Sequence, residues 1–283
     1  MEIKSLKGID FNALYKAFNQ AFADYEMQLD KMQLQSMLKR RGFNPDLSFA
    51  AFDKDEIVAF TFNGIGDFNG LSTAYDTGTG TLKEYRGQGL ASQIFEYSVP
   101  YLREMGIKQY LLEVLQHNPK AISVYTKQGF ETTREFYYFR QKSEKIENKI
   151  KAIDYPYTIK PISINDFDSI TRFWDFIPSW QNSLESIDRA KDDFVSLGLF
   201  SENRLVGYFV FEPTSGDIIQ LAVDKQERRK GIASLLLKEM IDLNKNDSVK
   251  VINTDITNDP LTHFLQSKNI PIAGKQFEMI KKI

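Results

Sequence analysis

One short motif occurs twice in this chain of 283 residues, each time between an apolar strand and an apolar helix. The motif reads R-x-x-G-x-A. It begins at Arg86 after a strand-like segment at 71–82, and again at Arg228 after the apolar segment 218–223. Beyond each motif, apolar residues recur at helical spacing. A repeated strand–turn–helix unit predicts two copies of one α/β plan.

The glycine turn of each copy has the features of an anion site. Small residues at the first turn of a helix let a ligand approach the backbone. The free N–H groups there and the positive end of the helix dipole suit a phosphate or pyrophosphate. The spacing matches neither a Walker loop nor a G-x-G-x-x-G dinucleotide fingerprint. One such turn alone is equally well a loop with two glycines, and its recurrence favours a ligand site.

Matched residues trace the repeat along the chain. The pairs are Ile3 with Ile159, Asp10 with Asp166, Arg86 with Arg228, and Asn118 with Asn258. Their separation shortens from 156 to 140 residues along the chain, as expected if the second copy has shorter loops. We therefore predict a first domain at 1–141, a charged linker at 142–154 and a second domain at 155–283, each domain an α/β fold with a mixed sheet.

Hydrophobic periodicity and turn residues predict the elements of both copies. In the first copy we expect helices at 11–22, 30–41, 91–105 and 118–129, and strands at 3–6, 47–52, 57–63, 71–82, 108–115 and 130–141. In the second copy we expect helices at 166–176 and 258–268, and strands at 195–201, 204–212, 218–223, 249–254 and 273–280. Three glycines, Gly64, Gly66 and Gly70, are expected to form a loop.

The composition narrows the classes of function. Net charge is −2, so bulk charge predicts neither nucleic-acid nor anionic-membrane binding. No apolar run is long enough to span a bilayer and the first residues do not read as a signal peptide, so the cytoplasm is the expected compartment. The chain has no Cys and two His, so we expect no disulfide, no Cys nucleophile and no metal site.

The order of elements, with the motif between the fourth strand and the next helix, resembles the GCN5-related N-acetyltransferase (GNAT) superfamily. A second segment supports the resemblance: residues 118–130 read NPKAISVYTKQGF and are similar to the family's N-x-x-A-x-x-x-Y-x-x-x-G-F pattern. The two segments carry the resemblance for the first copy, residues 1 to about 140, and the second copy matches through Ala233 and less closely beyond it. The whole chain is similar to tandem GNAT proteins.

The resemblance implies that acetyl-CoA binds along the fourth strand and the glycine turn. In the first copy the positions that match the family's cofactor contacts are Thr79, Gly80, Thr81, Arg86, Gly87, Gln88, Gly89, Leu90, Ala91, Ser92, Asn118 and Tyr125. In the second copy they are Leu221, Ala222, Val223, Arg229, Lys230, Gly231, Ile232, Ala233 and Ser234. Two glycines within the fourth strand, Gly78 and Gly80, are costly unless a bulge or a close ligand requires them.

The resemblance also implies direct attack of a primary amine on the thioester, with an N–H of the bulged strand stabilising the developing oxyanion. Tyr125 matches the family's general acid, and a phenol with an ordinary pKa of about 10 is protonated at neutral pH. A buried aromatic with a satisfied hydroxyl is the alternative for this residue. Asp76 and Glu113 are candidate bases by placement, and each could instead be an ordinary carboxylate. Asp24 and Tyr25 are candidates for the acceptor groove.

The second copy departs from the family pattern after its glycine turn. Leu265 stands where the first copy has Tyr125, and leucine has no proton to donate. We therefore expect no standard catalysis in the second copy, while CoA binding and a purely structural role both stay open. The loop that holds Trp180 could contact a substrate or could simply be packed.

Three functions are compatible with these observations. The leading hypothesis is an acetyl-CoA-dependent N-acetyltransferase with its active site in the first copy. Its acceptor would be a small-molecule or peptide amine, and the protein would be a monomer or homodimer. The first alternative is a non-catalytic acyl-CoA-binding or sensing protein, in which the second copy is the ligand module. A nucleotide-binding protein that uses the same glycine turns is the third.

Overall fold

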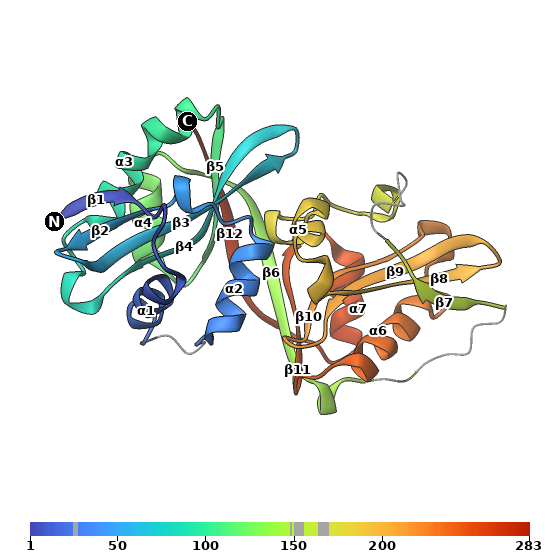
Figure 1. The fold of residues 1–283 in the computed structure, drawn as a ribbon. Coiled ribbons are helices and arrows are strands. Elements are labelled where there is room, and N and C mark those ends of the chain that lie inside the picture. The colour runs from blue at the N-terminus through green and yellow to red at the C-terminus, as the bar shows by residue number, and fades with distance from the viewer. Residues whose placement is uncertain (25–27, 148, 150–155, 164–169) are drawn as a thin grey trace. The chain divides into compact units, whose positions relative to one another are not determined.

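The computed structural model describes residues 1–24, 28–147, 149, 156–163 and 170–283. The chain divides into two compact units (Figure 1). Unit 1 comprises residues 1–133 and 277–283, and unit 2 comprises residues 134–276. The fold is α/β with mixed sheets, as predicted.

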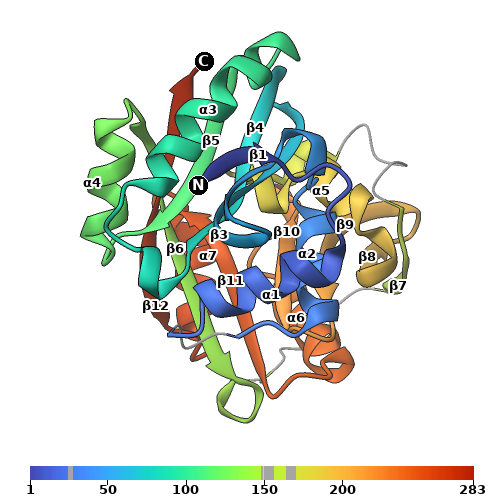
Figure 2. The ribbon, with the colours of Figure 1, turned by 60° about the vertical axis from the view of Figure 1, so that its left-hand side comes forward.

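Unit 1 is built on a mixed sheet. Its strands are β1 (Glu2–Ser5), β2 (Phe49–Asp53), β3 (Glu56–Phe68), β4 (Leu71–Thr81) and β5 (Gln109–Leu115). They lie in this order, antiparallel from β1 to β4, and β5 pairs with β4 in parallel. Beside β5 lies the end of β12 (Ile272–Lys282), which Figure 2 shows in red, and β6 (Glu131–Lys142) follows it in the order.

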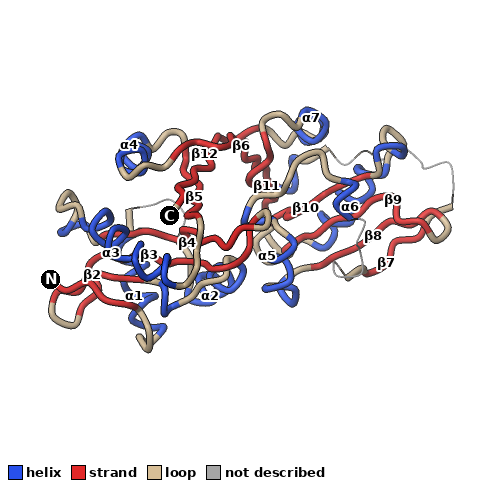
Figure 3. Tube along the Cα trace, turned by 90° about the horizontal axis from the view of Figure 1, so that it is seen from above, coloured by secondary structure: helices blue, strands red, loops and turns tan. Residues whose placement is uncertain are grey.

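Four helices cover the two faces of this sheet: α1 (Phe11–Ala21), α2 (Lys31–Arg40), α3 (Leu90–Glu104) and α4 (Pro119–Lys127). Asp10 caps α1, and Asp30 with Gln33 forms a capping box at α2. The first two helices pack on one face through aromatic side chains that include Phe18, Phe60 and Phe62. The other two pack on the opposite face, and Figure 3 shows α4 across the strands from α1 and α2.

Strand β4 separates from β5 after three paired positions, Thr73 to Tyr75. Its pairing with β3 also shifts register between Phe62 and Asn63, so that one residue, Thr77, is extra on β4. A bulge of this kind bends a strand and re-aims its side chains. The predicted bulge is therefore present, and it lies where β4 leaves its parallel neighbour.

Unit 2 repeats the plan in the second half of the sequence. Its strands are β7 (Thr158–Pro161), β8 (Val195–Ser201), β9 (Arg204–Glu212), β10 (Asp217–Val223) and β11 (Ser248–Asp255), and its helices are α5 (Leu184–Arg189), α6 (Ile232–Leu243) and α7 (Asp259–Ser267). The sheet runs β6-β11-β10-β9-β8-β7. Strands β10 and β11 pair in parallel at one position, Asp217 with Lys250. Strands β9 and β10 shift register at Ile219, which repeats the bulge of unit 1.

The predicted elements agree closely with those observed, with two differences. Gly64 and Gly66 lie inside β3 and not in a loop, because β3 stays paired with β4 as far as Phe68. Residue 64 must be glycine, since a Cβ there would stand 2.0 Å from the carbonyl oxygen of Arg41. The helix predicted at 166–176 begins at residues outside those described, and a short 3-10 turn covers Ile170–Phe173.

The compact units differ from the boundaries that the sequence repeat predicts, 1–141, 142–154 and 155–283. Strand β6 starts in unit 1 and continues into unit 2 from Arg134, while β12 starts in unit 2 and its residues from Phe277 belong to unit 1. Residues 148 and 150–154 of the expected linker lie outside the described residues. No helix among the described residues is both long enough and apolar enough to cross a bilayer.

Candidate active site

A cavity of about 180 Å³ opens in unit 1 where β4 leaves β5. It lies between the end of β4 and the helices α3 and α4. Five predicted site residues on two elements, β4 and α3, line it: Asp76, Thr79, Gly80, Thr81 and Ala91. A sixth, Tyr125, reaches it from α4. The fold thus brings together the candidate acid, one candidate base and the strand expected to hold the cofactor arm.

Asp76 has the most unusual environment in this cavity. The Thr79 hydroxyl donates to its Oδ2 at 2.9 Å. Its Oδ1 is shielded from water and has no hydrogen-bond partner among the described residues, although residue 76 as a whole is partly exposed. Burial raises the pKa of Asp76 to about 6, against the opposing effect of hydrogen bonds from Thr79, Gly78 and Tyr125. A carboxylate with this pKa can exchange a proton near neutral pH.

Tyr125 stands beside Asp76. Its hydroxyl donates to Asp76 Oδ2 over 3.4 Å, at the long end of the hydrogen-bond range. Its ring packs edge-on against Phe130, with ring centroids 5.7 Å apart. The residue therefore combines a packed ring with a hydroxyl at the cavity, and the two interpretations given to it from the sequence coexist.

Glu113 lies elsewhere in the unit. Its carboxylate accepts a hydrogen bond from the Tyr75 hydroxyl, and burial followed by the charge of Glu113 raises the pKa of Tyr75 well above its usual value. Glu113 is absent from the described residues that line the cavity. Asp24, proposed for the acceptor groove, pairs with Arg86 at 3.1 Å, and Tyr25 lies outside the described residues.

The glycine turn has the backbone of an anion site. Gly87 and Gly89 have φ of 81° and 74°, and Gly89 stands at the N-cap of α3 without a side-chain cap. Arg86 folds back onto the protein: its guanidinium donates to the carbonyl oxygens of Thr81 at 3.2 Å and Ala21 at 2.9 Å. Arg86 thus fixes the turn to the strand end, and its guanidinium is occupied by protein groups.

Two further predicted cofactor residues have local structural partners. Asn118 caps α4 by accepting from the Ala121 N–H at 3.2 Å. Gly80 lines the cavity, but the reason for a glycine there lies on the opposite side of the strand. A Cβ at this position would stand 2.6 Å from the Phe60 ring. The glycine at position 80 is therefore explained by packing.

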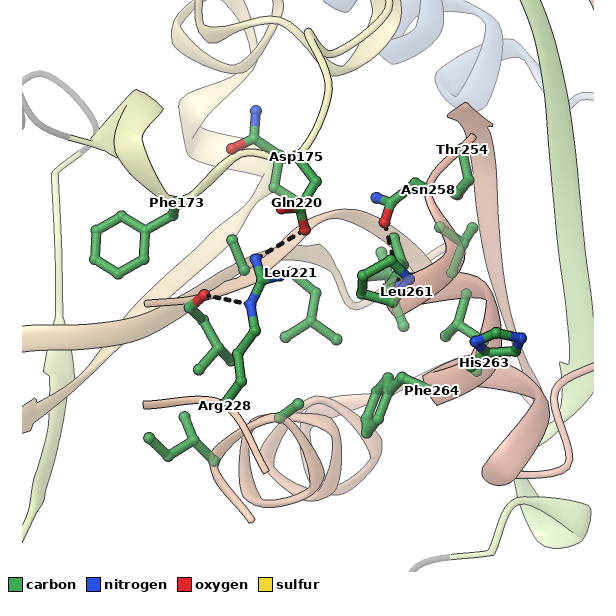
Figure 4. Close-up of a pocket in the computed structure, with 18 of the residues that line it drawn as sticks. Phe173, Asp175, Gln220, Leu221, Arg228, Thr254, Asn258, Leu261, His263 and Phe264 are labelled. Atoms are coloured by element: carbon green, nitrogen blue, oxygen red, sulfur yellow. Dashed lines mark hydrogen bonds and ion pairs between the residues drawn. The ribbon is translucent and has the colours of Figure 1, made fainter. Parts of the chain in front are cut away.

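Unit 2 holds a larger cleft in the corresponding place, with a volume of about 850 Å³. Figure 4 shows Gln220 and Leu221 of β10 on one side of the cleft, and on the other side Asn258, which caps α7, with Leu261 and Phe264 of α7. The cleft also takes in all but one of the cofactor residues predicted for the second copy: Leu221, Ala222, Val223, Arg229, Gly231, Ile232, Ala233 and Ser234. The remaining residue, Lys230, pairs with Glu227 at 2.7 Å.

The two glycine turns have the same backbone. In unit 2 the positive φ values fall on Arg229, at 67°, and Gly231, at 92°. Arg228 donates to the Val223 carbonyl at 3.3 Å and pairs with Asp175 at 2.8 Å (Figure 4). This arrangement repeats that of Arg86 in unit 1. A non-glycine residue with positive φ is strained, so the turn is held although its sequence has changed.

The reacting end of the cleft differs between the units. Strand pairing places Ile218 of β10 at the position that Asp76 occupies on β4, one residue before each bulge. Leu265 of α7 stands at the position of Tyr125, and both Ile218 and Leu265 are fully buried. Unit 2 therefore keeps the cleft and the anion turn but lacks the carboxylate and the phenol.

A buried polar network borders the unit 2 cleft. The Trp174 indole donates to the Tyr208 hydroxyl at 2.8 Å, and Tyr208 donates to Gln220 at 2.8 Å. The amide of Gln220 donates to the Asn182 carbonyl at 2.7 Å. Trp180 itself is 1% exposed and lies against Arg189, so this part of the loop is packed. Asn182, two residues further on, lines the cleft.

Sequence reasoning missed most of the cavity walls. In unit 1 these are Thr61, Phe95, Tyr110, Ala121, Val124, Gln128 and Phe130. Thr61 could have been found, because it faces Thr79 across the β3–β4 ladder. The size of the unit 2 cleft had no signal in the sequence, because it depends on where residues 173–178 are placed.

Comparison with known proteins places this architecture in one family. The model of the Acetyltransferase (GNAT) family matches residues 11–130 and 163–268. Solved structures share the fold over the whole chain. A tandem GNAT protein from the clavulanic acid biosynthesis pathway aligns with a TM-score of 0.75 at 12% identity, over 99% of this chain and 98% of that one. A GCN5-related N-acetyltransferase from Sphaerobacter thermophilus aligns with a TM-score of 0.71 at 11% identity, over 99% and 95%.

Two curated relatives match part of the chain. N-alpha-acetyltransferase MAK3 of Arabidopsis thaliana is 28% identical over 95 residues, which are 34% of this chain and 50% of the relative. N-alpha-acetyltransferase 30 of Schizosaccharomyces pombe is 30% identical over 87 residues, 30% of this chain and 58% of the relative. The chain thus spans about half the length of the curated relatives it matches.

The burial of Asp76 predicts a pH-dependent effect on stability. Because its pKa is raised from 3.8 to about 6 in the folded protein, ionisation lowers the free energy of unfolding as pH rises through that range, and the whole cost is present above it. Asp76→Asn should therefore raise the free energy of unfolding at pH 7.5, by up to about 3 kcal/mol, and leave it unchanged at pH 3.5. Urea unfolding at the two pH values measures this. A variant less stable than the wild type at pH 7.5 would contradict it.

Proposed function

Because this chain belongs to the GNAT acetyltransferase family, we propose that it is an N-acyltransferase that moves an acetyl group from acetyl-CoA to a primary amine, with its active site in unit 1. The observation that carries the proposal is the pairing of Asp76 and Tyr125 at one cavity, 3.4 Å apart. One group is a buried carboxylate and the other a phenol, and they lie where a bulged strand leaves its parallel neighbour.

The residues around the cavity fit the cofactor. The β4 segment from Thr79 to Thr81 would lie along the pantetheine arm, and the N–H groups from Gly87 to Ser92 would hold the pyrophosphate. Two features support this placement. The turn has positive φ at Gly87 and Gly89, and Ala91 lines the cavity with no bulky side chain in the way.

The proposed roles in transfer follow from proton balance. Acetyl-CoA supplies the acetyl group as a thioester, so transfer to an amine removes one proton at nitrogen and requires one at sulfur. The Asp76 carboxylate, which lines the cavity and contacts Tyr125 through Oδ2, would take the proton from the amine at that oxygen. Tyr125 Oη would give its proton toward the sulfur.

The contact between the two groups would restore both of them. Protonated Asp76 would pass its proton across the 3.4 Å contact to the Tyr125 phenolate. Thr79, which donates to the same carboxyl oxygen, would hold the carboxylate in place. After one turnover each group has its original protonation state, and one proton has moved from nitrogen to sulfur.

The acceptor is proposed as a small-molecule or peptide amine. Both named relatives are N-alpha-acetyltransferases, which makes a peptide with a free α-amino group the first substrate to test. Glu113, with its hydrogen bond from Tyr75, lies away from the Asp76 cavity and has no proton-transfer role in this proposal.

A second candidate function is favoured for unit 2. The 850 Å³ cleft keeps the anion turn and the matching strand and helix positions, while Ile218 and Leu265 replace the reacting groups. We therefore propose that unit 2 holds CoA or acyl-CoA without transferring the acyl group. This is the non-catalytic ligand module of the alternative hypothesis, present beside a catalytic unit.

The base role of Asp76 predicts an acidic limb in the pH–rate profile. With a short peptide as acceptor, kcat/KM should fall as pH drops through about 6, because protonated Asp76 cannot accept a proton. Asp76→Asn should remove that inflection and lower kcat/KM at pH 7.5 by about 100-fold or more. Asp55→Asn, in the exposed β2–β3 turn, is the control and should behave as wild type. An inflection that persists in Asp76→Asn would rule the residue out as the base.

The two-site model predicts the stoichiometry of cofactor binding. Calorimetric titration with acetyl-CoA should give two sites per chain. Ala91→Trp should block the unit 1 site and Ala233→Trp the unit 2 site, because these matched small residues line the two cavities. Loss of activity should follow Ala91→Trp alone. A single site that disappears with Ala91→Trp would leave unit 2 with a structural role only.

A further inference from the structure

The helix that carries Tyr125 ends in a defined motif. The Phe130 N–H bonds to the Tyr125 carbonyl at 3.0 Å, and the N–H of Gly129, whose φ is 84°, bonds to the Thr126 carbonyl at 3.0 Å. This is a Schellman arrangement, which satisfies the carbonyls of the last turn from within the chain. The carbonyl of Gln128, the C-cap residue, takes its partner from another segment.

That partner is the ammonium of Lys281, on the last strand of the sequence. Lys281 Nζ donates to the Gln128 carbonyl oxygen and lies 5.5 Å from the centre of the Phe95 ring. Gln128 and Phe95 both line the cavity that holds Asp76. A cation at this place also complements the negative end of the helix dipole. One side chain thus joins the end of α4 to the α3 wall of the site.

The strand that delivers Lys281 is firmly part of unit 1. The side chain of Met279 is 2% exposed and belongs to the cluster that packs Tyr125 and Phe130. Thr133 donates to the Glu278 carboxylate at 2.9 Å, and the Ile283 N–H bonds to the Lys108 carbonyl at 3.0 Å. Lys281 is therefore held by its own strand, and its reach to α4 is not that of a free surface lysine.

Unit 2 repeats the connection by different chemistry. Helix α7 ends in the same motif, with Ile270 N–H bonded to the Leu265 carbonyl at 2.9 Å and Asn269 at φ 59°. The Lys268 carbonyl, which matches that of Gln128, accepts from the Glu147 N–H at 3.0 Å. Glu147 follows β6, the last strand of the first repeat. In each unit, therefore, a segment that is distant in sequence ties the end of this helix: β12 in unit 1 and the stretch after β6 in unit 2.

From this recurrence we propose that Lys281 is a positioning residue of the transfer site: it fixes the last turn of α4 and so holds the Tyr125 hydroxyl beside Asp76. The inference rests on the proposed function for its effect on turnover. Its structural part, the fixing of α4, stands without that function. Because β12 starts in unit 2 and ends in unit 1, the residue that orders the catalytic helix is supplied by a strand whose first half belongs to the non-catalytic unit.

The test compares Lys281→Met with Lys281→Arg in the full-length chain. Methionine keeps the length of the side chain and removes the donor and the charge, whereas arginine keeps both. Lys282→Met is the matched control, because Lys282 is the next residue on the strand and is exposed. Amide hydrogen exchange of residues 122–130 is measured first, since it requires no acceptor. Acetyl-CoA affinity and turnover of a short peptide follow.

We expect exchange in the last turn of α4 to speed up about tenfold or more in Lys281→Met and to return toward the wild-type rate in Lys281→Arg. The kcat of Lys281→Met should fall about tenfold, with acetyl-CoA affinity within about twofold of wild type. Unchanged exchange in Lys281→Met, or the same change in Lys282→Met, would overturn the proposal. Faster exchange with unchanged kcat would overturn the link to Tyr125 alone. If the wild type does not acetylate the peptide, the proposed function is contradicted. The exchange measurement then still decides whether Lys281 fixes the last turn of α4.

Discussion

The site in this protein depends on the separation of two parallel strands. Strand β4 pairs with β5 over three positions and then leaves it, at the point where a bulge adds Thr77 to the β3–β4 ladder. The separation opens a cavity inside the sheet layer, and the bulge places Asp76 at its wall. Unit 2 shows the same separation after one paired position and the same bulge at Ile219. The two units thus share one backbone arrangement, although the side chains at this place differ.

The side chains at that shared place decide what each unit can do. In unit 1 a carboxylate and a phenol meet there, and burial of the carboxylate raises its pKa. In unit 2 the same two positions are Ile218 and Leu265, which pack as part of the core. These two apolar side chains stabilise the fold, because no charge is buried, but they cannot transfer a proton. The larger cleft and the turn at Gly231 remain, which is the combination that a binding module needs.

Much of this could be predicted from the sequence, because the local signals were strong. The helices and the hairpin at 195–212 follow from side-chain period and turn residues, and two glycines within the fourth strand indicate a bulge or a close ligand. Tyr125 could be named because it matches a position of the family segment at 118–130, and Asp76 is one of two candidate bases by its place on the fourth strand. The loop predicted at Gly64 is wrong. The sequence alone does not distinguish a glycine that is required by a close carbonyl, here that of Arg41, from a glycine in a loop. The role of Lys281 had no local signal, because its partner at Gln128 is distant in sequence and strand exchange sets the contact.

We propose that Asp76 and Tyr125 act as one unit in transfer, and a double-mutant cycle separates this from two independent roles. Turnover is measured for the wild type, Asp76→Asn, Tyr125→Phe and the double variant, with acetyl-CoA saturating and one peptide acceptor. If the two groups share a proton path, the double variant should be about as slow as the slower single variant, because losing either group breaks the path. Rate losses that multiply in the double variant would show two independent residues and contradict the account.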